Sequence, residues 1–123
     1  MTVELNHTIV HARDKHASAA FVAEILGLTV GEPTGPFVPV VLGNDVTLDF
    51  MDSDHLSPQH YAFLVDDELF DTAHQRLLDR KVQTWADPDH QEPDAVNTRW
   101  GGRGVYFPDP VGHSLEIFTR APS

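Results

Sequence analysis

The sequence runs through the same order of elements twice, and this repeat is its strongest constraint on the fold. In each half, an alternating apolar segment is followed by a helical pattern and then by short β-rich runs. The pattern predicts β-α-β-β-β in both halves of one domain, 1–123, with module one at about 1–54 and module two at about 55–123. A chain of 123 residues with 41% hydrophobic residues is long enough to bury one core.

Each segment carries the signals of its element type. Residues 4–12 place His7, Ile9 and His11 on one face of an expected strand, and residues 14–28 have helical spacing between Asp14 as N-cap and Gly27 as stop. The other expected elements are strands at 28–33, 37–42, 46–51 and 59–66, a helix at 67–81, and strands at 82–87, 103–109 and 113–119.

The two halves also match residue by residue. His7 and His60 stand near the start of the first strand of each module, 53 positions apart. Asp49 in "TLDF" and Glu116 in "SLEI" stand 67 positions apart in the last strands. The additional 14 residues of module two fall mostly in 87–104, which we expect to be a long loop that covers the site and selects the ligand.

Composition excludes several kinds of partner. Eight Lys and Arg against 19 Asp and Glu give a net charge of −11, which repels nucleic acid and anionic membrane surfaces. No apolar run approaches the roughly 18 residues that cross a bilayer, and the N-terminus lacks a signal-peptide layout, so we expect a cytoplasmic protein. The chain has no cysteine, and any metal would therefore be held by His, Asp or Glu.

The four matched side chains suggest a metal centre. A carboxylate inside a sheet cavity costs several kcal/mol unless a positive charge compensates it, and a divalent cation would do so. Two His and a carboxylate on rigid strands are suited to such an ion. The plainer alternative is that Glu116 faces water and that each His is a hydrogen-bonded structural residue.

Several segments carry a resemblance to the vicinal oxygen chelate superfamily, which includes glyoxalase I, fosfomycin-resistance transferases, extradiol dioxygenases and bleomycin-binding proteins. These are "LNHTIVHARD", "FVAEILGL", "VTLDF", "HYAFLV" and, with the greatest specificity, "GRGVYFPDPVGHSLEIF". The resemblance implies an α+β fold in which two paired βαβββ modules form a cup-shaped mixed sheet with helices on the outside. It also implies a small-molecule substrate and a homodimer.

The resemblance further implies one divalent metal ion per site, which could be Ni, Co, Mn, Fe or Zn. His7, His60 and Glu116 match the usual ligand positions. Asp49 matches a fourth position that is glutamate in glyoxalase I. Because aspartate is one methylene shorter, Asp49 is either a ligand or a catalytic base beside the metal.

Other polar and aromatic residues are candidates of lower specificity. His11 shares a face with His7 and could contact substrate, or it could be a histidine at the rim. Arg103, between glycines in an acidic chain, could bind a substrate anion, or it could be a turn residue. Trp85, Trp100 and Tyr106 either line a pocket or pack in the core and loops, and 109–113 is expected to be a turn without chemistry.

Two classes of function follow from this set. The first is a metal-dependent enzyme on a small molecule with vicinal oxygens, as a lyase, isomerase or transferase, or as a ring-cleaving dioxygenase, with Glu116 and Asp49 as the catalytic carboxylates. The second is a metal-free sequestering protein of the bleomycin-resistance type. Whether a site is built within one chain or across a dimer is left open.

Overall fold

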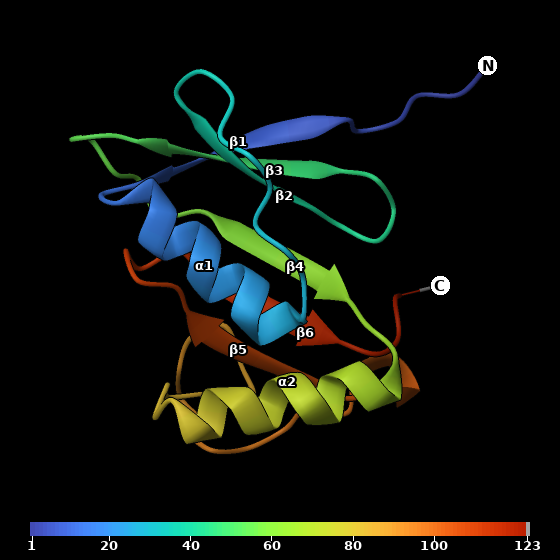
Figure 1. Ribbon diagram of the computed structural model, residues 1–123. Coiled ribbons are helices and arrows are strands. Elements are labelled where there is room, and N and C mark those ends of the chain that lie inside the picture. The colour runs from blue at the N-terminus through green and yellow to red at the C-terminus, as the bar shows by residue number, and fades with distance from the viewer. Residues whose placement is uncertain (123) are drawn as a thin grey trace. The chain divides into compact units, whose positions relative to one another are not determined.

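The computed structural model describes residues 1–122 and divides into two compact units, Met1–Leu56 and Ser57–Ser123 (Figure 1). This division lies two residues from the module boundary expected from the sequence. Each unit has a three-stranded mixed sheet and one α-helix. The α+β class is therefore confirmed, whereas the grouping of both modules into a single domain stays a prediction.

The first unit is built around its third strand. Its strands are β1 (His7–Ala12), β2 (Phe37–Val41) and β3 (Thr47–Asp52), and β3 lies in the centre, parallel to β1 and antiparallel to β2. Helix α1 (Lys15–Leu26) packs on all three strands. The core of the unit is formed by one face of the sheet and the helix. It contains the buried residues Val10, Ala12, Val38, Val40, Leu48, Phe50, Phe21, Val22 and Ile25.

The ends of α1 are the ones expected from the sequence. The Asp14 side chain accepts hydrogen bonds from the backbone N–H groups of His16 and Ala17, at 3.0 and 3.2 Å. These bonds satisfy two of the donors that a helix N-terminus leaves open. Gly27 ends the helix with a φ of 71°, in the left-handed region that glycine adopts without the steric cost of a Cβ.

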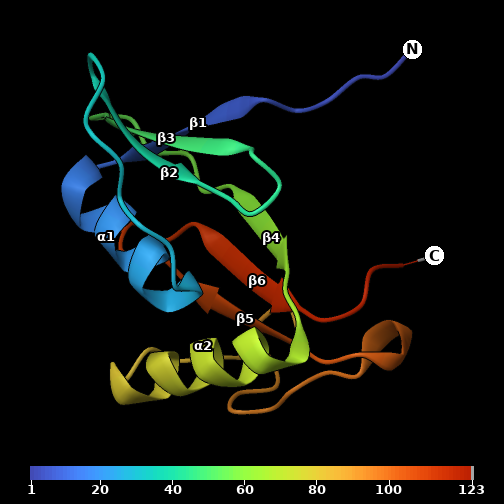
Figure 2. The ribbon, with the colours of Figure 1, turned by 45° about the vertical axis from the view of Figure 1, so that its right-hand side comes forward.

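The second unit repeats this plan. Its strands are β4 (His60–Leu64), β5 (Gly104–Pro108) and β6 (Ser114–Phe118), with β6 in the centre, parallel to β4 and antiparallel to β5. Helix α2 (Asp67–Asp79) lies alongside this sheet, as Figures 1 and 2 both show. A short 3-10 helix, η1 (Arg99–Gly101), precedes β5. The interior contains the buried residues Phe70, Ala73, Leu77, Val105, Phe107, Leu115 and Ile117.

The second strand expected in each module is reduced to isolated bridges. In 28–33, Val30 alone bridges to Val40, and in 82–87, Trp85 bridges to Pro93 and Tyr106. The second segment turns away because the Asp87 carboxylate accepts hydrogen bonds from the backbone N–H groups of residues 91 and 92, at 2.8 to 3.0 Å. The extended conformation therefore ends after one pair of ladder bonds.

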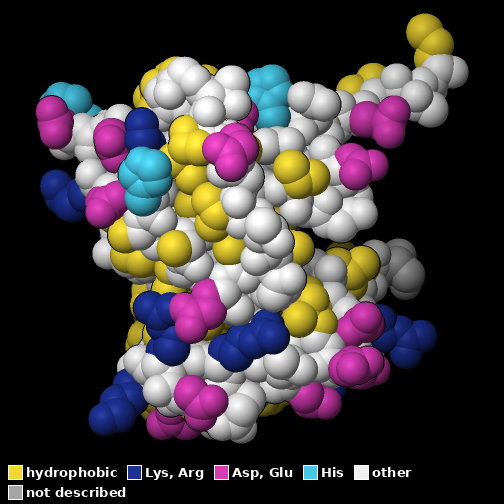
Figure 3. Space-filling view, in the orientation of Figure 1, with side chains coloured by type: hydrophobic (Ala, Val, Ile, Leu, Met, Phe, Trp, Pro, Cys, Tyr) yellow, Lys and Arg dark blue, Asp and Glu magenta, His cyan; other side chains and the backbone are white. Residues whose placement is uncertain are grey.

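Charged side chains on the face shown in Figure 3 are dispersed, with Lys and Arg among the Asp and Glu side chains. This agrees with acids that serve mainly to keep the surface solvated. None of the helices within residues 1–122 has the length and apolar character needed to cross a membrane.

Candidate metal centre

The four candidate ligands occupy equivalent positions in the two sheets. In the first unit, His7 is the register partner of Thr47, and Asp49 stands two residues further along β3. In the second, His60 is the partner of Ser114, and Glu116 stands two residues further along β6. Because side chains alternate along a strand, each His and its carboxylate lie on the same face of their sheet. We call this the site face of each unit.

Glu116 is buried, which contradicts the plainer interpretation that it faces water. Its residue is only 6% exposed, and its neighbours Leu115 and Ile117 are also buried on the other side of the strand. A charged carboxylate in such a place requires hydrogen-bond donors or a cation to offset its lost hydration. His60 and Tyr106 surround it.

His60 contacts Glu116 directly. Its Nε2 atom lies 3.2 Å from Glu116 Oε1, and its Nδ1 atom lies 3.1 Å from the carbonyl oxygen of Ser114. A carbonyl oxygen only accepts, so Nδ1 carries a proton and donates it. In neutral histidine, Nε2 then presents a lone pair to a carboxylate oxygen, and two acceptor atoms repel each other. This contact therefore requires a proton or a metal ion between the two atoms.

Tyr106, whose place the sequence left undecided, lies beside the candidate pair His60 and Glu116. It is buried, its ring stacks on that of His60 at a centroid distance of 5.9 Å, and it is the register partner of Glu116 on β5. Burial, and then the charge of the Glu116 carboxylate, raises the pKa of the Tyr106 hydroxyl. The hydroxyl therefore stays protonated beside Glu116, and its oxygen accepts a hydrogen bond of 2.9 Å from Arg99 Nη1.

The turn at 109–113 also contributes to the site, although no role was expected for it. His113 is 1% exposed, and its Nδ1 atom accepts a hydrogen bond of 2.9 Å from the backbone N–H of Gln59. The backbone N–H of Ser114 donates to the carbonyl of Gln59 at 2.8 Å. These bonds fix the start of β4 immediately before His60. His113 thereby positions a candidate ligand.

In the first unit, Asp49 is more exposed than Glu116, whereas His7 is exposed as His60 is. The exposed His7 has its Nδ1 atom 2.8 Å from Asn6 Oδ1, so its Nε2 atom is the one left to bind a ligand. Asp49 is partly buried between its register partners Ile9 and Pro39. His11 is exposed on the same site face, as its alternation with His7 predicted.

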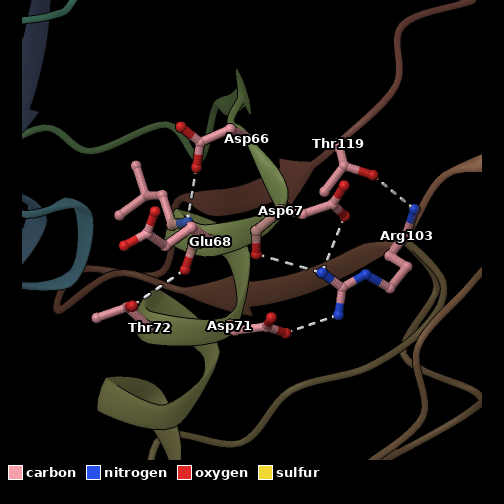
Figure 4. Close-up of polar contacts among 8 residues, drawn as sticks. Asp66, Asp67, Glu68, Asp71, Thr72, Arg103 and Thr119 are labelled. Carbon is pink, nitrogen blue, oxygen red and sulfur yellow. Dashed lines mark hydrogen bonds and ion pairs between the residues drawn. The ribbon is translucent and has the colours of Figure 1, made fainter.

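Arg103 is engaged within the second unit. Its guanidinium donates to Asp71 Oδ1 at 2.7 Å and to Asp67 Oδ1 at 3.0 Å, and it lies 4.5 Å from the centre of the Phe70 ring (Figure 4). Its backbone N–H donates to Thr119. These contacts tie the segment before β5 to the first two turns of α2. They favour the structural alternative for Arg103 over contact with a substrate.

The structure brings together one candidate pair, His60 and Glu116, and adds Tyr106 beside it. Within residues 1–122 there is no group of three or more His, Asp or Glu side chains close enough together to hold a metal ion. One sequence signal could have identified Tyr106. A turn centred on Val111 sets the register of β5 and β6 and places Tyr106 opposite Glu116.

Comparison with known proteins identifies the family of this fold. The chain is 31% identical to the glutathione transferase FosA of Serratia marcescens over 124 residues, which span 95% of this chain and 81% of that protein. The chain belongs to the vicinal oxygen chelate superfamily. It is also 29% identical to the metallothiol transferase FosB of Lysinibacillus sphaericus, over 97% of this chain and 84% of that protein. No family model matches the sequence.

Solved structures of this superfamily have the same fold. Two are named oxidases, ChaP-H2 and ChaP-H1. ChaP-H2 is 55% identical to this chain, with a TM-score of 0.97 and coverage of 98% of this chain and 96% of that one. ChaP-H1 is 57% identical, with a TM-score of 0.95 and coverage of 98% of both chains. A glyoxalase/dioxygenase from Nostoc punctiforme is 26% identical, with a TM-score of 0.73, over 97% of this chain and 92% of that one.

Proposed function

We propose that this protein is a metal-dependent enzyme that oxidises a small molecule through two neighbouring substrate oxygens. The observation that carries the metal is the contact between His60 Nε2 and the buried Glu116 carboxylate. Since Nδ1 is committed to the Ser114 carbonyl, Nε2 and the Glu116 carboxylate are the acceptors that would hold a divalent cation. A metal-bound histidine that donates its other N–H to a backbone carbonyl is a common arrangement.

His7 would be the third ligand, because it repeats the position of His60 in the first module. Its Nδ1 atom is likewise held by an oxygen, that of Asn6, which leaves Nε2 as the donor. Asp49 would be a fourth ligand or a base beside the substrate oxygens. Two His and one carboxylate suit Fe(II), Mn, Ni, Co or Zn, and the same set with open positions is typical of Fe(II) in oxygen-dependent enzymes.

A divalent ion bound there would withdraw charge from the two substrate oxygens and stabilise their deprotonated form. The residues of the chain would do the rest. Tyr106, the buried register partner of Glu116, would donate a hydrogen bond to its carboxylate and limit the access of water to it. Asp49 would accept a proton from a substrate hydroxyl, and His11, on the same site face, would contact the substrate.

Oxidation is the reaction that the comparisons favour. The two structures named oxidases are 55% and 57% identical to this chain over nearly the full length, whereas the two named transferases are 31% and 29% identical. Dioxygen is the oxidant in this proposal. In a ring-cleaving reaction both of its atoms enter one product, so that no additional reductant is consumed.

Thiol transfer to a small electrophile is a second candidate, on the basis of the names of FosA and FosB. The two reactions differ in what they consume. Oxidation removes dioxygen from solution in proportion to substrate, whereas thiol transfer proceeds without dioxygen and requires a thiol.

The test begins with metal analysis of protein purified after growth with Fe, Mn, Ni, Co and Zn. We expect about one ion per site, and loss of that ion in His60→Ala and Glu116→Gln. The matched controls are His16→Ala and Glu32→Gln, which change exposed residues outside the site. The loaded protein is then assayed with a panel of catechols in an oxygen electrode, and with glutathione and fosfomycin under nitrogen.

Three results would overturn the proposal in different ways. Metal content near zero in the wild-type protein, with small-molecule binding that survives His60→Ala, favours metal-free sequestration. Bound metal with thiol-adduct formation and no oxygen uptake favours the transferase. Normal metal content in Glu116→Gln would show that the Glu116 carboxylate is not a metal ligand.

A further inference from the structure

Trp100 has an unusual backbone conformation for an aromatic residue. Within residues 1–122, the non-glycine residues with positive φ are Asp45, Lys81, His90, Asp94 and Trp100. Asp and His tolerate this region relatively well, whereas bulky residues adopt it rarely. Trp100 has a φ of 54° and a ψ of 24°, inside the short helix η1.

Its side chain lies at the site face of the second unit. The Trp100 ring meets that of Phe118 at 61° and a centroid distance of 6.3 Å. Phe118 stands two residues after Glu116 in β6, on the same side of the strand, so the two side chains are about 7 Å apart along it. Trp100 directly follows Arg99 in the chain, and the Arg99 side chain donates to the Tyr106 hydroxyl.

The surrounding contacts hold Trp100 in this place. Asn97 and Gly104 exchange both backbone hydrogen bonds, at 3.0 and 3.1 Å, and close the loop that presents η1. Gly102 leaves no space for a side chain, because a Cβ there would lie 2.7 Å from atoms of Thr119 and Arg120. The backbone of η1 therefore lies directly against the residues that follow β6.

Core packing does not account for this arrangement. Trp100 is 49% exposed, so much of its ring is presented to solvent while its backbone carries a steric cost. Residues in sparsely populated backbone regions persist where the surroundings impose them, and such residues cluster at ligand-binding sites. An exposed aromatic ring that contacts Phe118, on the strand face that carries Glu116, offers a stacking surface.

We infer that Trp100 contacts the substrate and selects molecules with a planar, apolar body next to their two metal-binding oxygens. This inference rests on the proposed function and narrows its substrate class to catechol-like aromatic compounds. The ring of the substrate stacks on Trp100, while its oxygens point along β6 toward Glu116.

The test compares two probes that offer two neighbouring oxygens each. Catechol has a planar ring, and acetohydroxamic acid has none. Binding of both to metal-loaded protein is measured by calorimetry for the wild type, Trp100→Asn and Trp100→Phe, with metal content and thermal unfolding recorded on the same samples. Asn tolerates the left-handed region, and Phe keeps an aromatic ring.

Lys81→Asn is the matched control, since Lys81 has a φ of 58° directly after α2. We expect Trp100→Asn to bind catechol about fivefold to tenfold more weakly, the range that aromatic contacts contribute. Its affinity for acetohydroxamic acid, its metal content and its unfolding temperature stay at or above those of the wild type. Trp100→Phe recovers part of the catechol affinity, and Lys81→Asn changes neither affinity.

Unchanged catechol affinity in Trp100→Asn overturns this inference and leaves the metal-dependent function intact. Equal weakening of both probes with a lower unfolding temperature also overturns it, because Trp100 is then a structural residue. Absence of metal from the wild type, with no binding of either probe, overturns the proposed function and the inference together.

Discussion

The Tyr106 hydroxyl accepts a hydrogen bond from Arg99, and we propose that it donates one to Glu116, its register partner. Tyr106→Phe removes a donor from a buried carboxylate while keeping the ring that stacks on His60. We expect this variant to lose about 1–3 kcal/mol of stability at neutral pH, the range for an unsatisfied buried group. Urea unfolding of metal-free protein measures this change.

Tyr61→Phe is the control for this prediction, because Tyr61 faces the opposite side of the sheet and contacts His113. The metal affinity of the two variants is compared by competition with a chelator. We expect a loss of affinity in Tyr106→Phe only. Equal metal affinity in both variants would show that Tyr106 does not hold the carboxylate in place for the ion.

His113 gives a second prediction at the scale of single residues. His113→Leu leaves the Gln59 N–H without its acceptor, and we expect a loss of about 1–3 kcal/mol in the free energy of unfolding. His113→Asn provides an oxygen near the position of Nδ1, so it should recover much of this loss. Denaturant unfolding gives the stabilities. Equal stability of the Leu and Asn variants would contradict the assigned hydrogen bond.

The metal content of the same two variants distinguishes a positioning role from a purely structural one. If the bond to Gln59 sets the orientation of β4, His113→Leu binds metal more weakly even where it remains fully folded. His113→Asn then restores metal affinity together with stability.

At the scale of secondary-structure elements, Arg103 joins the segment before β5 to the start of α2. The hydrogen bond from Arg103 lowers the pKa of Asp71 below its ordinary value of 3.8. A carboxyl group with a lowered pKa stabilises the fold above its unfolded-state value, and this contribution is lost as the pH falls through the folded-state value. Stability should therefore decrease below about pH 4, and less steeply in Arg103→Gln.

The measurement is a series of urea midpoints from neutral to acidic pH for wild type, Arg103→Gln and Asp71→Asn. We expect both variants to be slightly less stable at neutral pH and to converge with the wild type in acid. A parallel acid profile in all three would contradict the ion pair. Normal stability combined with weaker substrate binding in Arg103→Gln would instead support contact between Arg103 and the substrate.

The elements that the sequence predicted well are those with local signals. Asp14 and Gly27 mark the ends of α1, and alternation places His7 and His11 on one face of β1. The expected strands at 28–33 and 82–87 were too long, because alternation does not reveal where a side chain such as that of Asp87 begins to bond the backbone and turn the chain. A segment whose extended conformation ends early still has the alternating sequence pattern of a full strand.

The candidate site was predictable to the extent that it repeats. His60 matches His7 and Glu116 matches Asp49 when the two halves of the sequence are compared. The structure places the side chains of His60 and Glu116 in contact. Tyr106 and His113 were missed because their roles depend on a hairpin register and on a bond between residues 59 and 113. Such long-range pairings follow from tertiary packing and leave little local pattern.

At the scale of the whole molecule, the resemblance predicts a homodimer. Light scattering over a range of concentrations should then give a mass near twice the 13.7 kDa of the chain. β1 and β4 are edge strands of their sheets, and such edges can pair with another chain. A mass equal to the monomer at every concentration would contradict this prediction.

Mixing His7→Ala with His60→Ala then distinguishes two arrangements of the site. If each site takes its two His from different chains, mixed dimers regain one intact site, and metal content rises after mixing. If each site lies within one chain, every site keeps one substitution and no metal is regained.

The identical register of the candidate residues in the two sheets points to duplication of a shorter ancestral gene. Such a gene would encode one module. Two identical modules would then pair, and each substitution would change both of them. Two halves joined in one chain change independently, and an aspartate at 49 with a glutamate at 116 is one such difference. Asp49→Glu would make the two halves alike at this position.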